Sequence, residues 1–170
     1  LAVTRIEDGR MQLKLTTELM DEIVTEALSH IHRKKGEHPI RVVSREDFLF
    51  AKIDARLMVQ VIINLVDNAV KYTPPETEIE IQMEKKEDKV VISVKDQGAG
   101  IPDSYKPYVF DMFFTGENKI SDNRRSLGLG LALCKSIVNA HGGEICVSDA
   151  VPHGAVFTFS LPAGEVQLHE

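Results

Sequence analysis

The stretch NLVDNAVKY, residues 64–72, lies in the longer run DARLMVQVIINLVDNAVKYTP and predicts the central helix of the fold. At 100° per residue its apolar face is wider than a surface helix needs, so we expect the helix to be mostly buried. The narrow remaining arc carries Gln60, Asn64, Asp67, Asn68 and Lys71. Two Asn residues one turn apart cost stability unless their amides meet a cavity, a ligand or ordered water. The arc is therefore either a narrow solvated face or one wall of a binding site.

Length and composition favour one globular domain. The chain has 170 residues, 43% of them hydrophobic, which is enough for a single core. Its net charge of −6, with both signs dispersed, argues against nucleic acid as a partner. No apolar run reaches the ~18 residues of a membrane span, and Cys134 and Cys146 fit no metal-ligand pattern. We expect a soluble, cytoplasmic domain with reduced thiols and without direct membrane contact.

Several elements are predicted ahead of and around the central helix. Residues 1–9 resemble the end of a helix that stops at Gly9, and residues 11–16 predict a first strand. Thr16 or Thr17 is expected to cap a helix that runs to about Gly36. Two strands joined by a polar turn are expected over 40–53, and Asp54 and Pro74 are expected to bound the central helix.

Two strands follow, over 77–86 and 88–96, and the second ends in a carboxylate. Val90, Ile92 and Val94 share a strand parity that continues to Asp96, which therefore projects to the covered side of the sheet. A buried carboxylate needs hydrogen-bond partners, so Asp96 points to a site; the alternative is an Asx-type turn on nearby amides. The next stretch, DQGAGIP (96–102), contains Gly98 and Gly100, which allow a ligand to approach the backbone closely.

The last third predicts a loop, a helix and two strands. A short helical segment is expected from Asp103, and the phenylalanines of YVFDMFF (108–114) would anchor a polar lid over 115–126. The helix of LGLGLALCKSIVNAHGG (127–143) begins with glycines whose amides are open to a phosphate. Strands over 144–148 and 155–162 follow, and 163–170 is expected to be a frayed tail. The interleaved helices and hairpins predict an α+β fold, a two-layer sandwich with helices on one face of a mixed, mostly antiparallel sheet.

Four segments, NLVDNAVKY, DQGAGIP, YVFDMFF and SLGLGLALCKSIVNAHGG, stand in an order that resembles the N, G1, F and G2 boxes of sensor histidine kinases. These kinases belong to a superfamily with the gyrase, MutL and Hsp90 ATPases. The resemblance covers about residues 11–162 and implies the Bergerat-type ATP-binding fold. The stretches VTRIEDGR and PHGAVFTFSLP also resemble kinases of the potassium-responsive type.

The resemblance implies a role for each matching residue. Asn68 would be the Mg²⁺ ligand, with Asn64 and Lys71 at the phosphates of ATP. Tyr72 would pack on the purine, and Asp96 would accept the adenine amino N–H beside Gly98 and Gly100. The amides at the start of the last helix would meet the phosphates, and a basic lid residue would reach the terminal phosphate. The residues concerned are Gly128, Gly130 and Leu131 for the helix, and Lys119, Arg124 and Arg125 for the lid, with the two arginines favoured.

Position 64 favours a kinase over an ATPase. The hydrolytic relatives carry a Glu there as general base, whereas Asn64 cannot accept a proton at neutral pH. None of the six histidines fits the HExxTP acceptor motif of the family. We therefore expect the catalytic half of a histidine kinase, which transfers the γ-phosphoryl group to a separate dimerisation and phosphoacceptor domain and acts upstream of a response regulator. The full-length kinase could still be membrane-anchored.

The expected domain limits are a linker or dimerisation-helix end at 1–10, a catalytic domain at 11–162 and a tail at 163–170. Because the chain begins with Leu1, we expect it to be a piece of a longer protein. The alternative functions are a serine kinase of the anti-sigma type, a slow ATPase, and a nucleotide-binding regulatory module without transfer activity.

Overall fold

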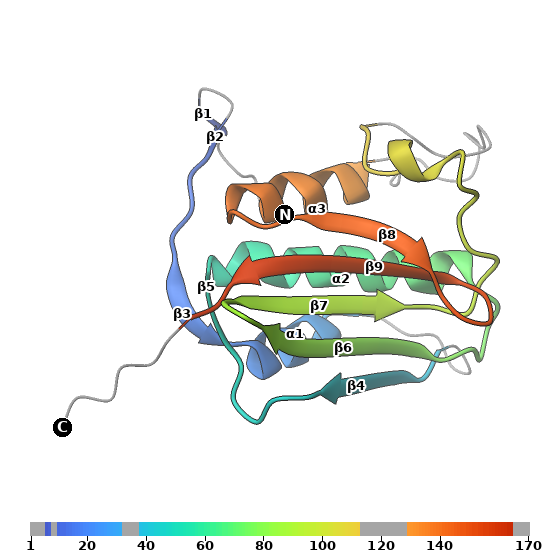
Figure 1. Ribbon diagram of the computed structural model, residues 1–170, viewed down its shortest axis with the longest axis horizontal. Coiled ribbons are helices and arrows are strands. Elements are labelled where there is room, and N and C mark those ends of the chain that lie inside the picture. The colour runs from blue at the N-terminus through green and yellow to red at the C-terminus, as the bar shows by residue number, and fades with distance from the viewer. Residues whose placement is uncertain (1–5, 8–9, 32–37, 113–128, 165–170) are drawn as a thin grey trace.

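A five-stranded mixed sheet forms one layer of the fold (Figure 1). The computed structural model describes residues 6–7, 10–31, 38–112 and 129–164. The strand order is β4-β6-β7-β9-β8, and only the β4–β6 pair is parallel. These strands are β4 (Ile40–Ser44), β6 (Ile79–Lys86), β7 (Lys89–Lys95), β8 (Ile145–Asp149) and β9 (Ala155–Pro162). The predicted mixed, mostly antiparallel sheet is confirmed.

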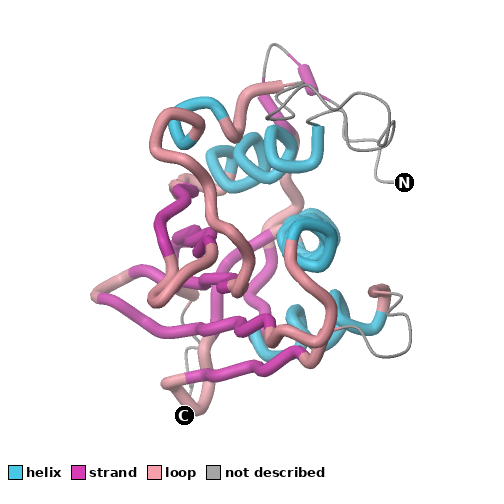
Figure 2. The backbone as a smooth tube through the Cα atoms, turned by 90° about the vertical axis from the view of Figure 1, so that its right-hand side faces the viewer, coloured by secondary structure: helices cyan, strands magenta, loops and turns pink. Residues whose placement is uncertain are grey.

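Helices of the described residues form the second layer, on one face of the sheet (Figure 2). They are α1 (Met20–Ser29), α2 (Ala55–Tyr72) and α3 (Leu129–Ala140). The central helix α2 lies between the other two and packs on β6 and β7. This arrangement confirms the predicted two-layer α+β sandwich. Within the described residues, no helix combines the length and the apolar character that a membrane crossing requires.

Alternating side chains of the strands form the core beneath the helices. Strand β6 buries Ile79, Ile81 and Met83, and the inward face of β9 buries Phe157 and Phe159. These residues meet the apolar face of α2, of which Met58, Val61, Ile62 and Leu65 are fully buried. The pattern follows from the period of two in the strands and the period of 3.6 in the helix. It confirms that α2 is largely buried.

The ends of α2 lie where the sequence predicts them. The Asp54 Oδ1 atom accepts a hydrogen bond from the Leu57 amide at 3.3 Å, which satisfies one of the free N–H groups of the first turn. At the other end Thr73 is extended, with φ −128° and ψ 154°, because Pro74 disfavours a helical residue before it. The helix therefore ends at Tyr72.

The N-terminal predictions need correction. Residues 12–15 belong to no strand, and the chain instead forms β3 (Thr16–Leu19), which pairs antiparallel with β5 (Phe50–Ile53). The strand predicted over 11–16 is therefore wrong for most of its length. Leu19 occupies the N-cap of α1 without a side-chain hydrogen bond, and the predicted threonine cap is wrong. Pairing with β5 holds both threonines in a strand, and tertiary pairing overrides the local capping preference. The helix ends at Ser29, and residues 32–37 lie outside the described part.

Other segments differ in smaller ways. The chain forms a short antiparallel pair between β1 (Ile6–Glu7) and β2 (Arg10–Met11), so the predicted helical end is wrong there. Strands β4 and β5 exist as predicted, but each pairs with a different strand rather than with the other. The predicted tail does not begin at 163, because the amides of Ala163 and Gly164 donate to the carbonyls of Asp88 and Phe50 at 2.9 and 2.8 Å. Residues 165–170 lie outside the described part.

Candidate functional site

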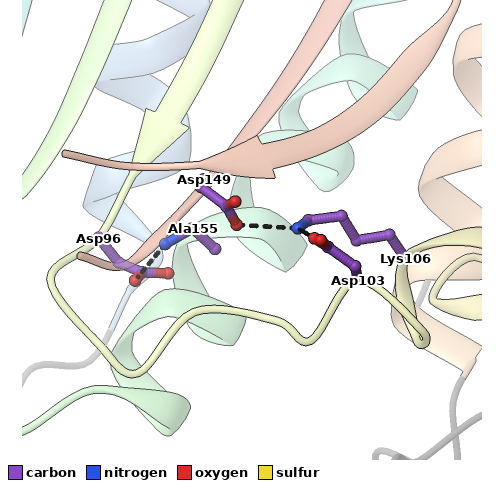
Figure 3. A network of polar contacts seen from close by, with 5 residues as sticks. All are labelled: Asp96, Asp103, Lys106, Asp149 and Ala155. Carbon is purple, nitrogen blue, oxygen red and sulfur yellow. Dashed lines mark hydrogen bonds and ion pairs between the residues drawn. The ribbon is translucent and has the colours of Figure 1, made fainter. Parts of the chain in front are cut away.

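Asp96 follows the last residue of β7, and its residue surface is only 6% exposed, as its strand parity predicts. Its Oδ1 atom accepts a hydrogen bond from the Gly98 amide at 2.9 Å. The same atom accepts a second bond from the Ala155 amide at 3.0 Å (Figure 3). The bond to Gly98 is the local Asx-type contact, and the bond to Ala155 joins the strand end to β9. Both bonds use the same oxygen. No described residue donates to the second carboxylate oxygen, Oδ2, so this oxygen is available to a donor from a ligand.

The glycines after Asp96 allow the backbone to pack closely. A Cβ at Gly98 would lie 2.9 Å from the Tyr72 carbonyl oxygen and from the Thr73 side chain, so a larger residue would push the loop off the end of α2. Gly100 has φ +80°, which L-residues with side chains rarely adopt. The predicted glycine-dependent loop is therefore present, and it packs on the C-terminal end of α2.

The polar arc of α2 faces partly away from the core. Gln60 Nε2 donates to Asn64 Oδ1 at 2.9 Å, and Asn64 Nδ2 makes a long contact of 3.5 Å to the Gly130 carbonyl of α3. Asn68 is half-buried, while Lys71 and Tyr72 are exposed at the end of the helix. From Asn64 to Tyr72 the helix rises about 12 Å. The arc therefore connects the start of α3 with the Gly98 loop, and an extended nucleotide can span this length.

Helix α3 covers the other side of Asn64. Cys134 is fully buried against α2, with its Sγ atom 3.7 Å from the Val61 carbonyl. Burial raises the pKa of the Cys134 thiol to about 12, with smaller opposing effects from Asn64 and from its own backbone. A Cβ at Gly130 would meet nothing within 4 Å, which leaves the first turn of α3 open. The side chain of Leu131 is half-buried and packs against the hydrophobic core.

An ion-pair network that the sequence did not indicate fixes the segment after Gly100 (Figure 3). Lys106 Nζ lies 2.9 Å from Asp149 Oδ1 at the end of β8 and also pairs with Asp103. Both carboxylates raise the pKa of Lys106, the Asp103 hydrogen bond most strongly, and the same bond lowers the pKa of Asp103. The predicted short helical segment is the 3₁₀ turn η1 (Lys106–Tyr108). Beyond it Phe110 meets Phe157 edge to face, with ring centroids 5.9 Å apart.

The β8–β9 loop, residues 150–154, also contacts the Asp96 region, and sequence reasoning missed it. His153 Nδ1 lies 3.0 Å from the Gly98 carbonyl oxygen. A Cβ at Gly154 would lie 2.1 Å from the Asp96 carbonyl oxygen, and Gly154 has φ +117°. The one available signal was the glycine itself, immediately before a predicted strand.

Some predicted site residues are not placed by the structure. Lys119, Arg124, Arg125 and Gly128, with most of the predicted lid, lie outside the described residues, as do Phe113 and Phe114. Within the described ranges, no group of three or more His, Cys, Asp or Glu side chains could hold a metal ion.

Comparison with known proteins gives consistent results. The pattern of the histidine kinase-, DNA gyrase B- and HSP90-like ATPase family matches residues 53–165. Sensor protein KdpD of Clostridium acetobutylicum is 43% identical over 162 residues, which cover 95% of this chain and 18% of that protein. The adaptive-response sensory kinase SasA of Gloeothece citriformis is 32% identical over 165 residues, which cover 95% of this chain and 42% of that protein. The chain thus spans less than half the length of either relative.

Two solved structures of a histidine kinase superpose on most of this chain. The nucleotide-free catalytic domain of histidine kinase ThkA superposes with a TM-score of 0.78 at 30% identity, covering 88% of this chain and 96% of that one. ThkA in complex with the response regulator protein TrrA gives a TM-score of 0.75 at 29% identity, with 88% of this chain and 42% of that one covered.

Proposed function

Because the chain belongs to the histidine kinase-, DNA gyrase B- and HSP90-like ATPase family, we propose that it positions Mg-ATP for γ-phosphoryl transfer to a histidine on another domain. Members of this family are ATP-binding domains, so ATP is the nucleotide of this fold. One observation carries the placement of ATP: buried Asp96 keeps one carboxylate oxygen for a ligand at the end of the polar arc of α2.

The base end of the nucleotide lies at Asp96. The adenine amino group donates to Asp96 Oδ2, and the Gly98 and Gly100 backbone passes beside the ring. Tyr72 is 59% exposed at the end of α2, next to the residues that Gly98 contacts, and its ring covers the purine. A hydrogen bond to an ionised carboxylate is stronger than one between neutral groups, so Asp96 supplies base affinity and selects for the amino group.

The phosphate end lies toward the start of α3. Asn64, Lys71 and the open amides near Gly130 and Leu131 meet the phosphates, and Arg124 or Arg125 reaches the terminal phosphate. The amide oxygen of Asn68 holds Mg²⁺ together with phosphate oxygens and water, which suits a cation that binds few protein ligands. The metal supplies charge neutralisation at the phosphates. Asn68 is half-buried on the polar arc of α2, between Asn64 and Tyr72, which supports this assignment.

Asn64 favours transfer over hydrolysis. An amide cannot take a proton from water at neutral pH, and in this chain its oxygen already accepts a bond from Gln60 at 2.9 Å. Without a general base at this position, the γ-phosphoryl group awaits a nucleophile from elsewhere. The acceptor is a histidine of a dimerisation and phosphoacceptor domain, and a response regulator receives the group downstream, in the cytoplasm. The structure of ThkA with the response regulator TrrA supports the second partner.

The test is the variant Asp96→Asn. Its amide retains an oxygen for Gly98 and Ala155 but places an N–H₂ donor against the adenine amino group. We expect ATP affinity to fall by about 10- to 100-fold, with the thermal melting temperature nearly unchanged. Calorimetric titration with Mg-ATP measures the affinity. The matched control is Asp88→Asn, at an exposed turn between β6 and β7, which should bind as the wild type does. Near-wild-type affinity of Asp96→Asn would remove Asp96 from the site.

A further inference from the structure

We propose that His153 is a positioning residue of the nucleotide site, and that it sets the preference for adenine by holding the Gly98 peptide that orients Asp96. This inference rests on the proposed function. His153 lies in the β8–β9 loop, far in sequence from the Gly98 loop, and none of the four boxes includes it.

The first step is the hydrogen bond of His153. Its Nδ1 atom lies 3.0 Å from the Gly98 carbonyl oxygen. A carbonyl oxygen only accepts, so Nδ1 carries the proton and donates. The bond forms in the Nδ1–H tautomer and in the charged form alike, so it does not depend on the charge of the ring.

The second step is what the bond holds. The Gly98 N–H donates to Asp96 Oδ1 at 2.9 Å, while the Gly98 carbonyl accepts from His153. Both polar groups of this residue are therefore engaged, one by the carboxylate and one by the imidazole. Glycine has more accessible backbone conformations than any other residue, so Gly98 depends on these two hydrogen bonds to stay in one conformation. Losing His153 frees one side of Gly98 and loosens one of the two bonds that orient the Asp96 carboxylate.

The third step is the anchoring of His153 itself. Its neighbour Gly154 is buried against the Asp96 backbone with no space for a side chain, and the Gly154 carbonyl accepts from the Ala150 amide at 2.9 Å. The next residue, Ala155, donates its amide N–H to Asp96 Oδ1 (Figure 3). Its carbonyl also accepts from the Asp96 amide at 2.9 Å. The β8–β9 loop is thus held against both the backbone and the carboxylate of Asp96. This keeps the His153 imidazole at the Gly98 carbonyl.

The experiment compares His153→Ala and His153→Asn with the wild type. For His153→Ala we expect ATP affinity to fall by about 2- to 5-fold, because one hydrogen bond with an exposed donor is lost, while affinity for inosine triphosphate stays constant. That nucleotide lacks the amino group that Asp96 recognises. His153→Asn keeps an N–H donor near the same place and should restore most of the preference. Val151→Ala is the control, because Val151 lies in the same loop and is 82% exposed.

A second readout is independent of nucleotide. In the free protein, hydrogen exchange of the Gly98 amide should be about 2- to 5-fold faster in His153→Ala than in the wild type and in Val151→Ala. Unchanged Gly98 exchange, or equal losses for ATP and inosine triphosphate, would overturn the role of His153. Failure of the wild-type chain to bind ATP would instead contradict the proposed function, and the exchange result would still decide whether His153 holds Gly98.

Discussion

The two cysteines occupy opposite environments, and their reactivity should differ. Cys134 lies on α3 and is buried against α2, and burial raises the pKa of its thiol to about 12. Cys146 is exposed on β8. Because the thiolate is the reactive form, we expect iodoacetamide at pH 8 to label Cys146 in the native protein and to spare Cys134. Mass spectrometry of the labelled chain measures this, and denatured protein labelled at both sites is the control. Rapid native labelling of Cys134 would show that the α2–α3 contact opens readily.

Single residues also show which parts of the site were predictable. Asp96 was predicted because strand parity is a local pattern, and its burial follows from the residues directly before it. His153 was not predictable in this way, because its partner Gly98 lies 55 residues away and only the pairing of β7 with β9 brings them together. The role of Lys106 was missed for the same reason, since Asp149 is on another strand.

At the scale of elements, the turn between α3 and β8 leaves no space for a side chain at Gly143. A Cβ at Gly143 would lie 1.8 Å from the Ser160 carbonyl oxygen, which is backbone and cannot move aside cheaply. We expect Gly143→Ala to lower the free energy of unfolding by about 1–3 kcal/mol, because β8 or α3 must shift. Urea denaturation measures the change.

Gly130→Ala is the comparison for that variant. A Cβ at position 130 would meet nothing within 4 Å, and Ala has a higher helix propensity than Gly. We therefore expect Gly130→Ala to raise the free energy of unfolding by up to about 1 kcal/mol. Equal destabilisation of the two variants would contradict the packing described for the turn at Gly143.

The ends of helices were predicted correctly where a single local signal, such as a capping residue or a proline, determines them. Asp54 and Pro74 bound α2 as expected, because a cap and a proline act on the chain next to them. The start of α1 was wrong because Thr16 and Thr17 can serve equally as caps or as strand residues. Pairing with β5 decided for the strand, and that partner is about 35 positions later in the chain.

Across the whole molecule, each of the four histidines that the structure describes has a hydrogen-bond partner within the chain. His38 and His141 are buried, and each bonds a backbone carbonyl through Nδ1, at 2.8 and 2.7 Å. His153 bonds Gly98, and His30 pairs with Glu26 on the exposed side of α1. His32 and His169 lie outside the described residues, and neither is in an HExxTP motif.

We therefore expect this chain to bind Mg-ATP without phosphorylating itself, and to give a labelled product only with a dimerisation and phosphoacceptor domain. Supplied as a separate fragment, the acceptor must associate from solution, so transfer should be slow but detectable; a covalent connection would raise its effective concentration. Incubation with γ-labelled ATP, first alone and then with the acceptor fragment, measures this, and Asp96→Asn should lose the product. Phosphohistidine is acid-labile, so an acid-stable product would favour a serine kinase. Strong labelling of the isolated chain would mean that one of its own histidines accepts, whereas bound ATP with no product in either reaction would favour a nucleotide-binding regulatory module.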